Sequence, residues 1–417
     1  MKKLQNSLLL LLIFAAMAAS CGRKESGQLI GVTDRPAWKG INPYGMVYVP
    51  SGTLHIGTGD EDISKQLVSR PKSISIQGFF MDDTEITNNE YRQFVKWVSD
   101  SLAHEALEHF IEDDGNTSEK PMIDWEMEIA WDDDEDGALE NLYYQGNERF
   151  SGRKELDVSK LVFEYQWYDW QRAAHDRNSN RTSHIHKEKI KVYPDTLCWI
   201  RDYAYSYNEP MTRNYFWHPA FDDYPVVGVN WKMAKAFCFW RSKVWDMYSE
   251  SDVNTEDFRL PTEHEWEYAA RGGRAEAPYP WGAYYTRNAK GCLLANFKPG
   301  RGNYPEDGGL YTVKADAYYP NDYGLYCMAG NVAEWTETAY YENAYSFLHD
   351  LNPDIRYDAK EEDNPTDKRK VIRGGSWKDI AFFLRTGTRS WEYQDTTKCY
   401  IGFRCVLTFL GRSINDF

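Results

Sequence analysis

The stretch RLPTEHEWEYAARGG, residues 259–273, carries the signals of a short, well-defined helix. Thr262 follows a proline, and Glu265 comes three residues later, which is the pattern of a capping box at the first turn of a helix. Trp266 and Ala269 then fall on one side of the helix, where they can pack inward. The stretch therefore predicts a helix that begins near residue 262 and buries one face.

Two further helices are predicted closer to the N-terminus. Thr87 and Glu90 form a second capping box, and the apolar residues that follow it at helical spacing are Tyr91, Phe94, Val95 and Val98. Another helix is predicted from Asn230, with a buried face made of Met233, Phe237, Trp240 and Val244.

Outside these helices the pattern is irregular. Residues 46–52 read as a short apolar strand closed by a turn, and the chain beyond residue 270 is rich in Gly, Pro, Asn and Tyr. We expect an α+β domain of low regular content, with short strands and long ordered loops.

The segment 100–215 differs from its surroundings, because it combines acidic runs with many Tyr and Trp residues and shows no sustained period. We interpret it as a large insertion on the surface of one domain formed by residues 42–99 and 216–412. Residues 203–217 hold six aromatics, which predicts that this part packs against the core or a partner.

The N-terminus predicts export and lipid attachment. Lys2 and Lys3 precede an apolar run over residues 8–19, and small residues lead directly to Cys21. We expect residues 1–20 to be a signal peptide, and residues 21–41 to be an acylated cysteine and a tether. The alternative is an ordinary secretory signal that leaves a free cysteine. Gly22 in place of an aspartate, by resemblance to bacterial lipoproteins, favours the periplasmic face of the outer membrane.

Charge and composition narrow the function classes. The 417 residues carry a net charge of −16 and 16% aromatics, which indicates a globular protein. Binding to nucleic acid, or broadly to anionic lipid, requires clustered cations, so neither is expected. Six cysteines follow Cys21, namely Cys198, Cys238, Cys292, Cys327, Cys399 and Cys405, and the sequence alone leaves about fifteen full pairings open.

Seven segments, in order along the chain, together resemble the formylglycine-generating-enzyme (sulfatase-modifying factor) family. They are MVYVPSGTLHIG (46–57), FMDDTEITNNEYRQF (80–94), PVVGVNWKMAKAFCFW (225–240), RLPTEHEWEYAARGG (259–273), YGLYCMAGNVAEW (323–335), RGGSW (373–377) and GFRC (402–405). The resemblance implies a C-type-lectin-like fold. It also implies a disulfide between Cys238 and Cys405.

Oxidases of that family use two cysteines that bind copper, shortly after the Gly-Gly-Ser segment. The matching positions here are Asp379 and Leu384, and neither side chain can supply a soft thiolate. We therefore expect no copper and no oxidase reaction. The segment Gly374-Gly375-Ser376 reads as a tight turn and not as a phosphate-binding loop, and Ser376 as a nucleophile is disfavoured. Arg385, Arg389 and Arg404 are expected to hold loops to the core through ion pairs or hydrogen bonds.

The resemblance also implies structural calcium at two loops. One site would use Asn296, the carbonyl of Phe297, Asp307 and the carbonyl of Gly309. The other would use Gly330, the carbonyl of Val332, and Glu334. Such mixtures of carboxylate and carbonyl oxygens suit Ca²⁺. The alternative is that these groups satisfy loop backbone without a metal ion.

Two motifs invite metal-site interpretations that the residues do not support. Asp132-x-Asp134-x-Asp136-Gly137 starts like a calcium-binding EF-hand loop, but its twelfth position is Tyr143. His104 and His109 are five residues apart, about 140° around a helix, so they are not expected to share one metal ion. His184 and His186 are expected to be exposed.

The tether ending in WKGINPY (38–44), the acidic insertion and the segment 199–224 look like the GldK/PorK lipoproteins of the gliding-motility and type IX secretion machinery, and the related lipoprotein GldJ is the near alternative. That resemblance implies a non-catalytic structural subunit, assembled into a periplasmic ring with a GldN/PorN-like protein and other secretion components. The alternatives are a metal-dependent oxidase with a different metal arrangement, and a module that binds glycan or peptidoglycan.

Overall fold

The computed structural model describes residues 42–57, 69–111, 121–131, 137–176, 178–248, 255–306 and 308–411. The predictions for the signal peptide, Cys21, Asp307 and the acidic run 132–136 fall outside these ranges. No helix within them is both long enough and apolar enough to cross a membrane.

The helices of the described part of the chain are α2 (Asn88–Ala106), α3 (Trp170–His175), α4 (Cys198–Asp202), α5 (Glu209–Asn214), α6 (Trp231–Tyr248) and α7 (Glu263–Arg271). The three predicted helices are present as α2, α6 and α7, and the structure adds the short helices α3, α4 and α5, which were not predicted. Both predicted capping boxes are present, since Thr87 and Glu90 close the start of α2, and Thr262 and Glu265 close the start of α7. The side-chain oxygens satisfy backbone N–H groups that would otherwise lack partners at a helix start.

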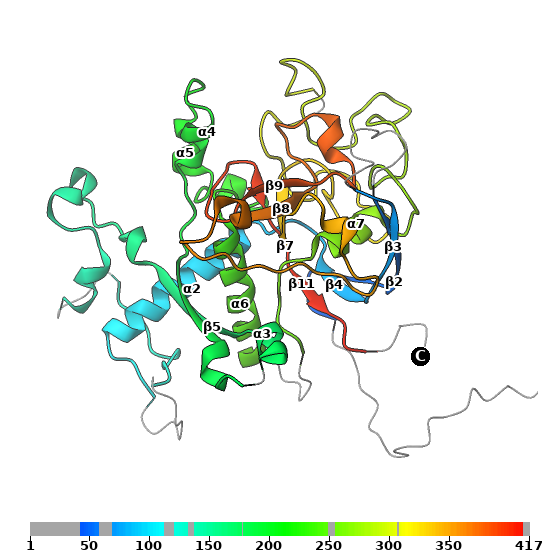
Figure 1. Cartoon of the computed structure of the whole chain (residues 1–417). Coiled ribbons are helices and arrows are strands. Elements are labelled where there is room, and N and C mark those ends of the chain that lie inside the picture. The colour runs from blue at the N-terminus through cyan, green and yellow to red at the C-terminus, as the bar shows by residue number, and fades with distance from the viewer. Residues whose placement is uncertain are drawn as a thin grey trace, which may run out of the picture. The chain divides into compact units, whose positions relative to one another are not determined.

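The strands form four small sheets. Their bounds are β1 (Met46–Val49), β2 (Gly52–Ile56), β3 (Lys72–Ile76), β4 (Phe79–Asp82), β5 (Val162–Tyr168), β6 (Ile185–Lys191), β7 (Ala333–Ala339), β8 (Arg369–Arg373), β9 (Ser390–Tyr393), β10 (Ile401–Gly402) and β11 (Val406–Thr408). The sheet orders are β1-β4-β11, β10-β7-β8-β9, β2-β3 and β5-β6. Only the β10–β7 pair is parallel among the strands described. This mixture of short strands and long connections confirms the expected α+β fold of low regular content (Figure 1).

Aromatic side chains join α2 and α6 in the main core. Tyr91 stacks on Phe237 with ring centroids 5.6 Å apart, and Phe94 meets the edge of the same ring at 5.8 Å. Phe403, from the turn between β10 and β11, reaches Phe237 at 5.4 Å. Distant parts of the sequence are therefore fixed together around one buried ring.

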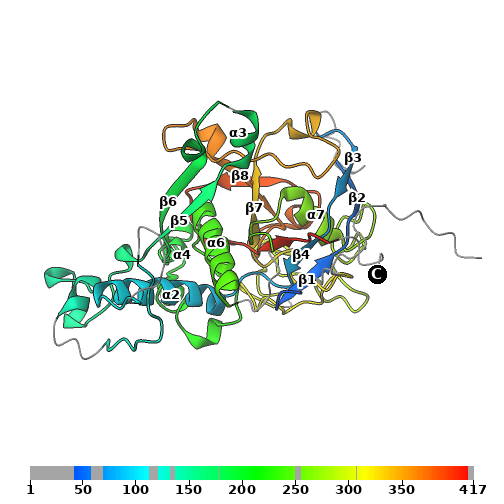
Figure 2. The ribbon, with the colours of Figure 1, turned by 90° about the horizontal axis from the view of Figure 1, so that it is seen from below.

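The hairpin β5–β6 belongs to the segment 100–215 and lies beside α6 (Figures 1 and 2). Phe163 and Tyr165 on β5 are buried in the main core, and Tyr165 stacks on Phe239 of α6 at 4.5 Å. This part of the predicted insertion is thus anchored to the domain by buried rings.

The expected separation of His104 and His109 around a helix and the expected exposure of His184 are both wrong. His104 and His109 do come together, because α2 ends at Ala106 and the helical angle no longer applies beyond that point. The left-handed backbone of Glu108, at φ 53°, turns the chain back toward the helix. His184 is buried, not exposed, and its Nε2 atom lies 2.6 Å from the hydroxyl of Ser179.

Candidate functional site

The loop that follows β8 contains the two positions at which the family resemblance places catalytic cysteines. Gly374 and Gly375 open this loop with φ angles of 90° and 67°, which side-chain-bearing residues rarely adopt. A Cβ atom on Gly375 would lie 2.9 Å from the backbone of Phe383. The predicted tight turn is therefore present, and it brings residues 381–384 back against the start of the loop.

Neither catalytic position fits a copper ion. The carboxylate of Asp379 accepts hydrogen bonds from the backbone N–H of Ser376 at 3.0 Å and from its hydroxyl at 2.6 Å. Leu384 is fully buried and packs with Tyr279 and Phe297. Cu(I) prefers soft thiolate ligands, whereas this loop offers a hydrogen-bonded carboxylate and a hydrocarbon. Ser376 is also fully buried, and its hydroxyl is used by Asp379.

Aromatic residues of the segment 100–215 cover this loop. Trp377 is 2% exposed and lies nearly parallel to Trp199 of α4, with ring centroids 6.4 Å apart. Tyr203 approaches the same indole at 5.4 Å, and Tyr311 meets it edge-on at 5.2 Å. The carboxylate of Asp202 also accepts a hydrogen bond from the backbone of Cys399 at 3.1 Å. We name the cover formed by Trp199 and Tyr203 the aromatic lid.

The packing of residues 203–217 is mixed. Tyr215 and Phe216 are buried, as the aromatic composition predicts, but Tyr205 and Tyr207 are 99% and 91% exposed. One part of the segment therefore packs on the domain, while the other presents tyrosines to the surroundings.

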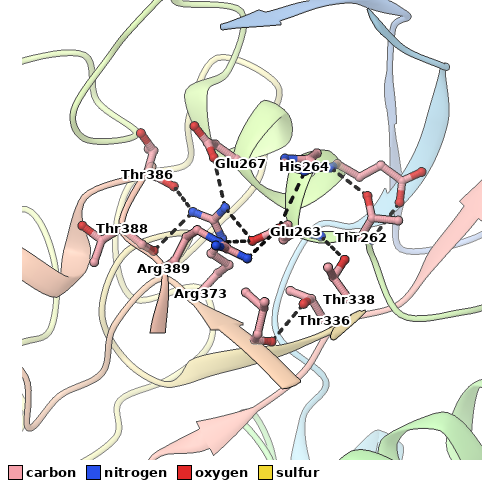
Figure 3. Close-up of polar contacts among 12 residues, drawn as sticks. Thr262, Glu263, His264, Glu267, Thr336, Thr338, Arg373, Thr386, Thr388 and Arg389 are labelled. Atoms are coloured by element: carbon pink, nitrogen blue, oxygen red, sulfur yellow. Dashed lines mark hydrogen bonds and ion pairs between the residues drawn. The ribbon is translucent and has the colours of Figure 1, made fainter. Parts of the chain in front are cut away.

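A buried ion-pair network joins α7 to the strands beside it (Figure 3). Arg389 donates to both oxygens of Glu263, at 2.7 and 3.0 Å. Arg373 donates to Glu263 at 3.2 Å and to Glu267 at 3.1 Å. Burial by itself raises the pKa of Glu263, but Arg389, His264 and Arg373 outweigh it and lower that pKa to about 2. The predicted loop-holding role of Arg389 is confirmed.

Arg373 extends the network to the loop itself. It donates to the backbone carbonyls of Thr386 and Thr388, at 3.1 and 3.2 Å (Figure 3). His264 lies beside this network, with its Nε2 atom 3.7 Å from Glu263, and burial lowers the pKa of His264. The groups are therefore organised to hold the loop in place.

The predicted second calcium site contains a buried ion pair in this structure. Glu334 accepts hydrogen bonds on both carboxylate oxygens from Arg404, at 2.7 Å each, and from the indole of Trp266 at 2.7 Å. The N–H of Val332 donates to Glu85 at 3.2 Å, and Gly330 has a φ angle of 79°. Calcium at this loop stays a prediction, and both carboxylate oxygens of Glu334 accept hydrogen bonds from Arg404.

The predicted first calcium site is partly assembled. The amide nitrogen of Asn296 donates to the carbonyl of Tyr311 at 2.8 Å, and Gly309 lies close to that amide. Phe297 follows in the same buried turn, while Asp307 is outside the described residues. In the described part of the chain, no three His, Cys, Asp or Glu side chains form a metal-holding group. Calcium at this loop also stays a prediction.

Cys238 and Cys405 are neighbours in the core. Their Sγ atoms lie 3.5 Å apart, and both residues are buried and present as free thiols. The positions are close enough for the expected bond, and the disulfide itself stays a prediction.

A large cleft lies beside the hairpin β5–β6, and few features of the sequence pointed to it. The cleft, of about 1110 Å³, lies between the hairpin β5–β6, helix α6 and residues 356–362. Lys235 and Lys370 lie at its floor, with their ammonium groups 4.5 and 3.7 Å from the ring centre of Trp231. Burial lowers the pKa of Lys370 to about 8. The features that could have indicated this cleft were two lysines in apolar surroundings. Lys235 lies among the apolar residues of α6, and Lys370 precedes the apolar pair 371–372.

Smaller cavities lie beside the covered loop. One of about 150 Å³ is lined by Gly375, Lys378 and Asp379, and one of about 460 Å³ is lined by Lys298, Arg301 and the stretch 380–382. The loop thus has limited open space next to it.

Comparisons with known proteins identify the family of the chain. The family model described as "Sulfatase-modifying factor enzyme 1-like domain" (FGE-sulfatase) matches residues 36–409. The formylglycine-generating enzyme of Bos taurus is 26% identical over 381 residues, which cover 90% of this chain and 78% of that protein. The inactive C-alpha-formylglycine-generating enzyme 2 of Bos taurus is 35% identical over 189 residues, 44% of this chain and 50% of that protein.

Among solved structures, PvdO from Pseudomonas aeruginosa is 17% identical, with a TM-score of 0.47, over 87% of this chain and 94% of that chain. The match to the family model extends over most of the chain and includes the loop at Asp379 and Leu384. The chain therefore belongs to the sulfatase-modifying factor (FGE-sulfatase) family and has its mixed α+β fold.

Proposed function

We propose that this chain is a non-catalytic member of its family and acts as a structural subunit. The observation that carries the proposal is the state of the loop after β8. Asp379 is bonded to Ser376, Leu384 is buried, and the aromatic lid covers Trp377. A substrate cysteine would find neither a thiolate nor a soft metal site there.

The finer proposal is an outer-membrane lipoprotein of the GldK/PorK kind, attached through Cys21 and assembled in a periplasmic ring with a GldN/PorN-like protein. The sequence resemblance supports it, and so do the exposed Tyr205 and Tyr207, because exposed aromatic side chains contribute strongly to protein interfaces.

Co-purification with the partner protein tests the assembly. The two proteins together should form a particle far larger than a one-to-one complex, and Tyr205→Ala with Tyr207→Ala should weaken it while leaving the fold intact. A strictly monomeric chain that ignores the partner would contradict the proposal. Cys21→Ala should move the protein from the membrane to the soluble periplasm, and retention after an alkaline wash would argue against lipid attachment.

An oxygen-consumption assay with copper and a cysteine-containing peptide tests the absence of catalysis. The expected result is no turnover above the peptide-free control. Bound copper with sustained turnover would establish the oxidase alternative instead.

The cleft beside the hairpin β5–β6 favours a second candidate function, the binding of a glycan such as peptidoglycan. Its walls include Trp167 and the 74% exposed Trp170, so that sugar rings could stack on the two indoles. A pull-down on purified sacculi should retain the protein, and Trp167→Ala with Trp170→Ala should release it. Equal retention of the double variant would exclude the cleft as the binding site.

A further inference from the structure

Residues 286–301 form a basic stretch on an acidic protein. The whole chain carries a net charge of −16, but this stretch contains no Asp or Glu. Its four cationic residues are Arg287, Lys290, Lys298 and Arg301. A bridge between Arg287 and Leu293 folds the first part of the stretch into a tight turn. The stretch therefore places positive charge at one defined part of the surface.

Three of these cations line a cavity of about 460 Å³, together with residues 380–382 of the loop after β8. The lining cations are Arg287, Lys298 and Arg301. The N–H of Lys298 donates to the carbonyl of Asp379 at 2.9 Å, so the basic stretch is bonded directly to that loop. Small-molecule sites commonly measure about 300–1,000 Å³. The cavity is therefore large enough for a small ligand.

The rest of the lining is largely apolar. Leu293 and Phe297 are buried in one cluster with Leu384, and Ala381 packs against the same cluster. Ile380 also lines the cavity, but its side chain is 55% exposed. A ligand that covered Ile380 would remove apolar surface from water, which is favourable. The cavity thus combines cations with apolar side chains that a ligand can cover.

The lining cations differ in how far they are already paired. Arg287 donates to the carbonyl of Gly291 at 2.7 Å and forms an ion pair with Glu306. Lys298 and Arg301 form no ion pair with any carboxylate in the described part of the chain. The ammonium of Lys298 lies 4.9 Å from the ring centre of Tyr304, a contact that leaves its charge in place, and Arg301 is exposed. Two positive charges at this cavity therefore lack a counter-charge among these residues.

We propose that this cavity binds a carboxylate that is joined to an apolar group, as in a small organic acid. The carboxylate pairs with Lys298 and Arg301, and the apolar group covers Ile380 and Phe382. Nucleic acid would require a longer run of cations than these two. The site goes beyond the structural role proposed above and does not depend on it, and it is separate from the cleft beside the hairpin β5–β6.

Calorimetric titration of the purified chain with octanoate tests the proposal. Octanamide is the matched ligand, because it has the same chain length without the negative charge. The expected result is one octanoate bound per chain, with octanamide binding at least about tenfold more weakly. Raising the NaCl concentration to about 1 M should weaken the binding of octanoate, since salt screens charge pairs near the surface, and should not weaken the binding of octanamide.

Substitutions place the binding at this cavity. Lys298→Met and Arg301→Met each remove one cation and should each weaken octanoate binding by about threefold. Lys290→Met is the matched control, because Lys290 is exposed in the same stretch and does not line the cavity. Ile380→Ser removes the exposed apolar side chain and should weaken the binding of both ligands. Circular dichroism checks that each variant is folded.

A peptide that ends in phenylalanine presents the same chemistry from a protein, through its terminal carboxylate. Competition between this peptide and octanoate shows which source the cavity prefers, and displacement in either direction supports the proposal. No saturable binding of octanoate by the parent would overturn it. The same affinity in the parent and in the double variant Lys298→Met with Arg301→Met would also overturn it.

Discussion

The guanidinium of Arg404 donates to both carboxylate oxygens of Glu334, at 2.7 Å each, with both side chains almost completely buried. The same guanidinium donates to the backbone carbonyls of Asp82 and Tyr326, at 3.1 and 3.0 Å. A single ion pair therefore connects β4, β7 and the approach to β11. Burying two charged groups costs much free energy unless each group has hydrogen-bond partners. Both groups of this pair have such partners.

Replacing one partner of this pair should be severely destabilising. Glu334→Gln removes the carboxylate to which Arg404 donates two hydrogen bonds, and we expect the free energy of unfolding to fall by about 3–5 kcal/mol. Asp322→Asn is the control, since its ion pair with Arg274 is exposed, and its stability should match the parent. Urea titrations of the three proteins measure both effects. Equal stability of all three would show that the buried pair contributes nothing.

Acid should weaken the network around α7. The folded-state pKa of Glu263 is about 2, below the ordinary 4.5, so its stabilising contribution is complete above about pH 4.5 and disappears as the pH falls toward 2. Unfolding free energies of the parent should therefore fall more steeply over this range than those of Glu263→Gln. Parallel pH profiles for the two proteins would contradict the assignment.

Raising the pH should increase the contribution of Lys370, at the floor of the cleft, to the free energy of unfolding. Lys370 has a folded-state pKa of about 8, below the ordinary 10.5, so between these values the unfolded chain binds a proton that the folded protein has released. Its contribution to stability therefore rises from pH 8 toward pH 10. The difference in unfolding free energy between the parent and Lys370→Met isolates this contribution from other titrating groups. A difference that stays constant over the range would refute the shifted pKa.

Removing one ring of the aromatic lid should loosen the loop beneath it. Tyr203→Ala deletes the contact with Trp377, so we expect faster amide hydrogen exchange over residues 374–379 and a loss of about 1–3 kcal/mol in stability. Tyr205→Ala, two residues along and 99% exposed, is the matched control and should change neither quantity. The lid would be irrelevant to the loop if both variants exchanged at the parent rate.

Calcium, if it binds as predicted near Asn296, should raise the melting temperature, because a ligand that binds only the folded state stabilises it. The measurement is the difference in melting temperature between Ca²⁺ and a chelator. That difference should vanish in Asn296→Ala, while His55→Ala should keep it. No shift in the parent would remove calcium from the description of this loop.

The elements that the sequence predicted well are those specified locally. The capping boxes at Thr87 and Thr262 depend on residues three positions apart, so they can be read directly, and the buried face of α6 follows from its helical spacing. The roles of Arg389 and Arg404 were also predicted. Their acidic partners, 126 and 70 residues away, were not, because the fold decides which carboxylate arrives.

The errors have physical causes as well. The two histidines were placed by extending an ideal helix past Ala106, and the left-handed Glu108 invalidated that extension. Lys370 lies in a short strand where a lysine would ordinarily point to solvent, yet it is fully buried against Trp231. A sequence pattern does not show that a helix ends at a left-handed residue other than glycine. It also does not show that a distant hairpin will form the wall of a cavity beside a given lysine.

The sheet β1-β4-β11 has one more consequence. β1 and β11 flank β4, so the described domain starts and finishes two strand spacings apart, about 10 Å, with a similar offset along the strands. A linker of a few residues could join the two ends, and the chain could be reopened near Tyr284, in a strongly exposed loop. A circular permutant made in this way should fold. Its new chain ends, and any reporter fused to them, would lie in the loop near Tyr284, and the core would be unaltered.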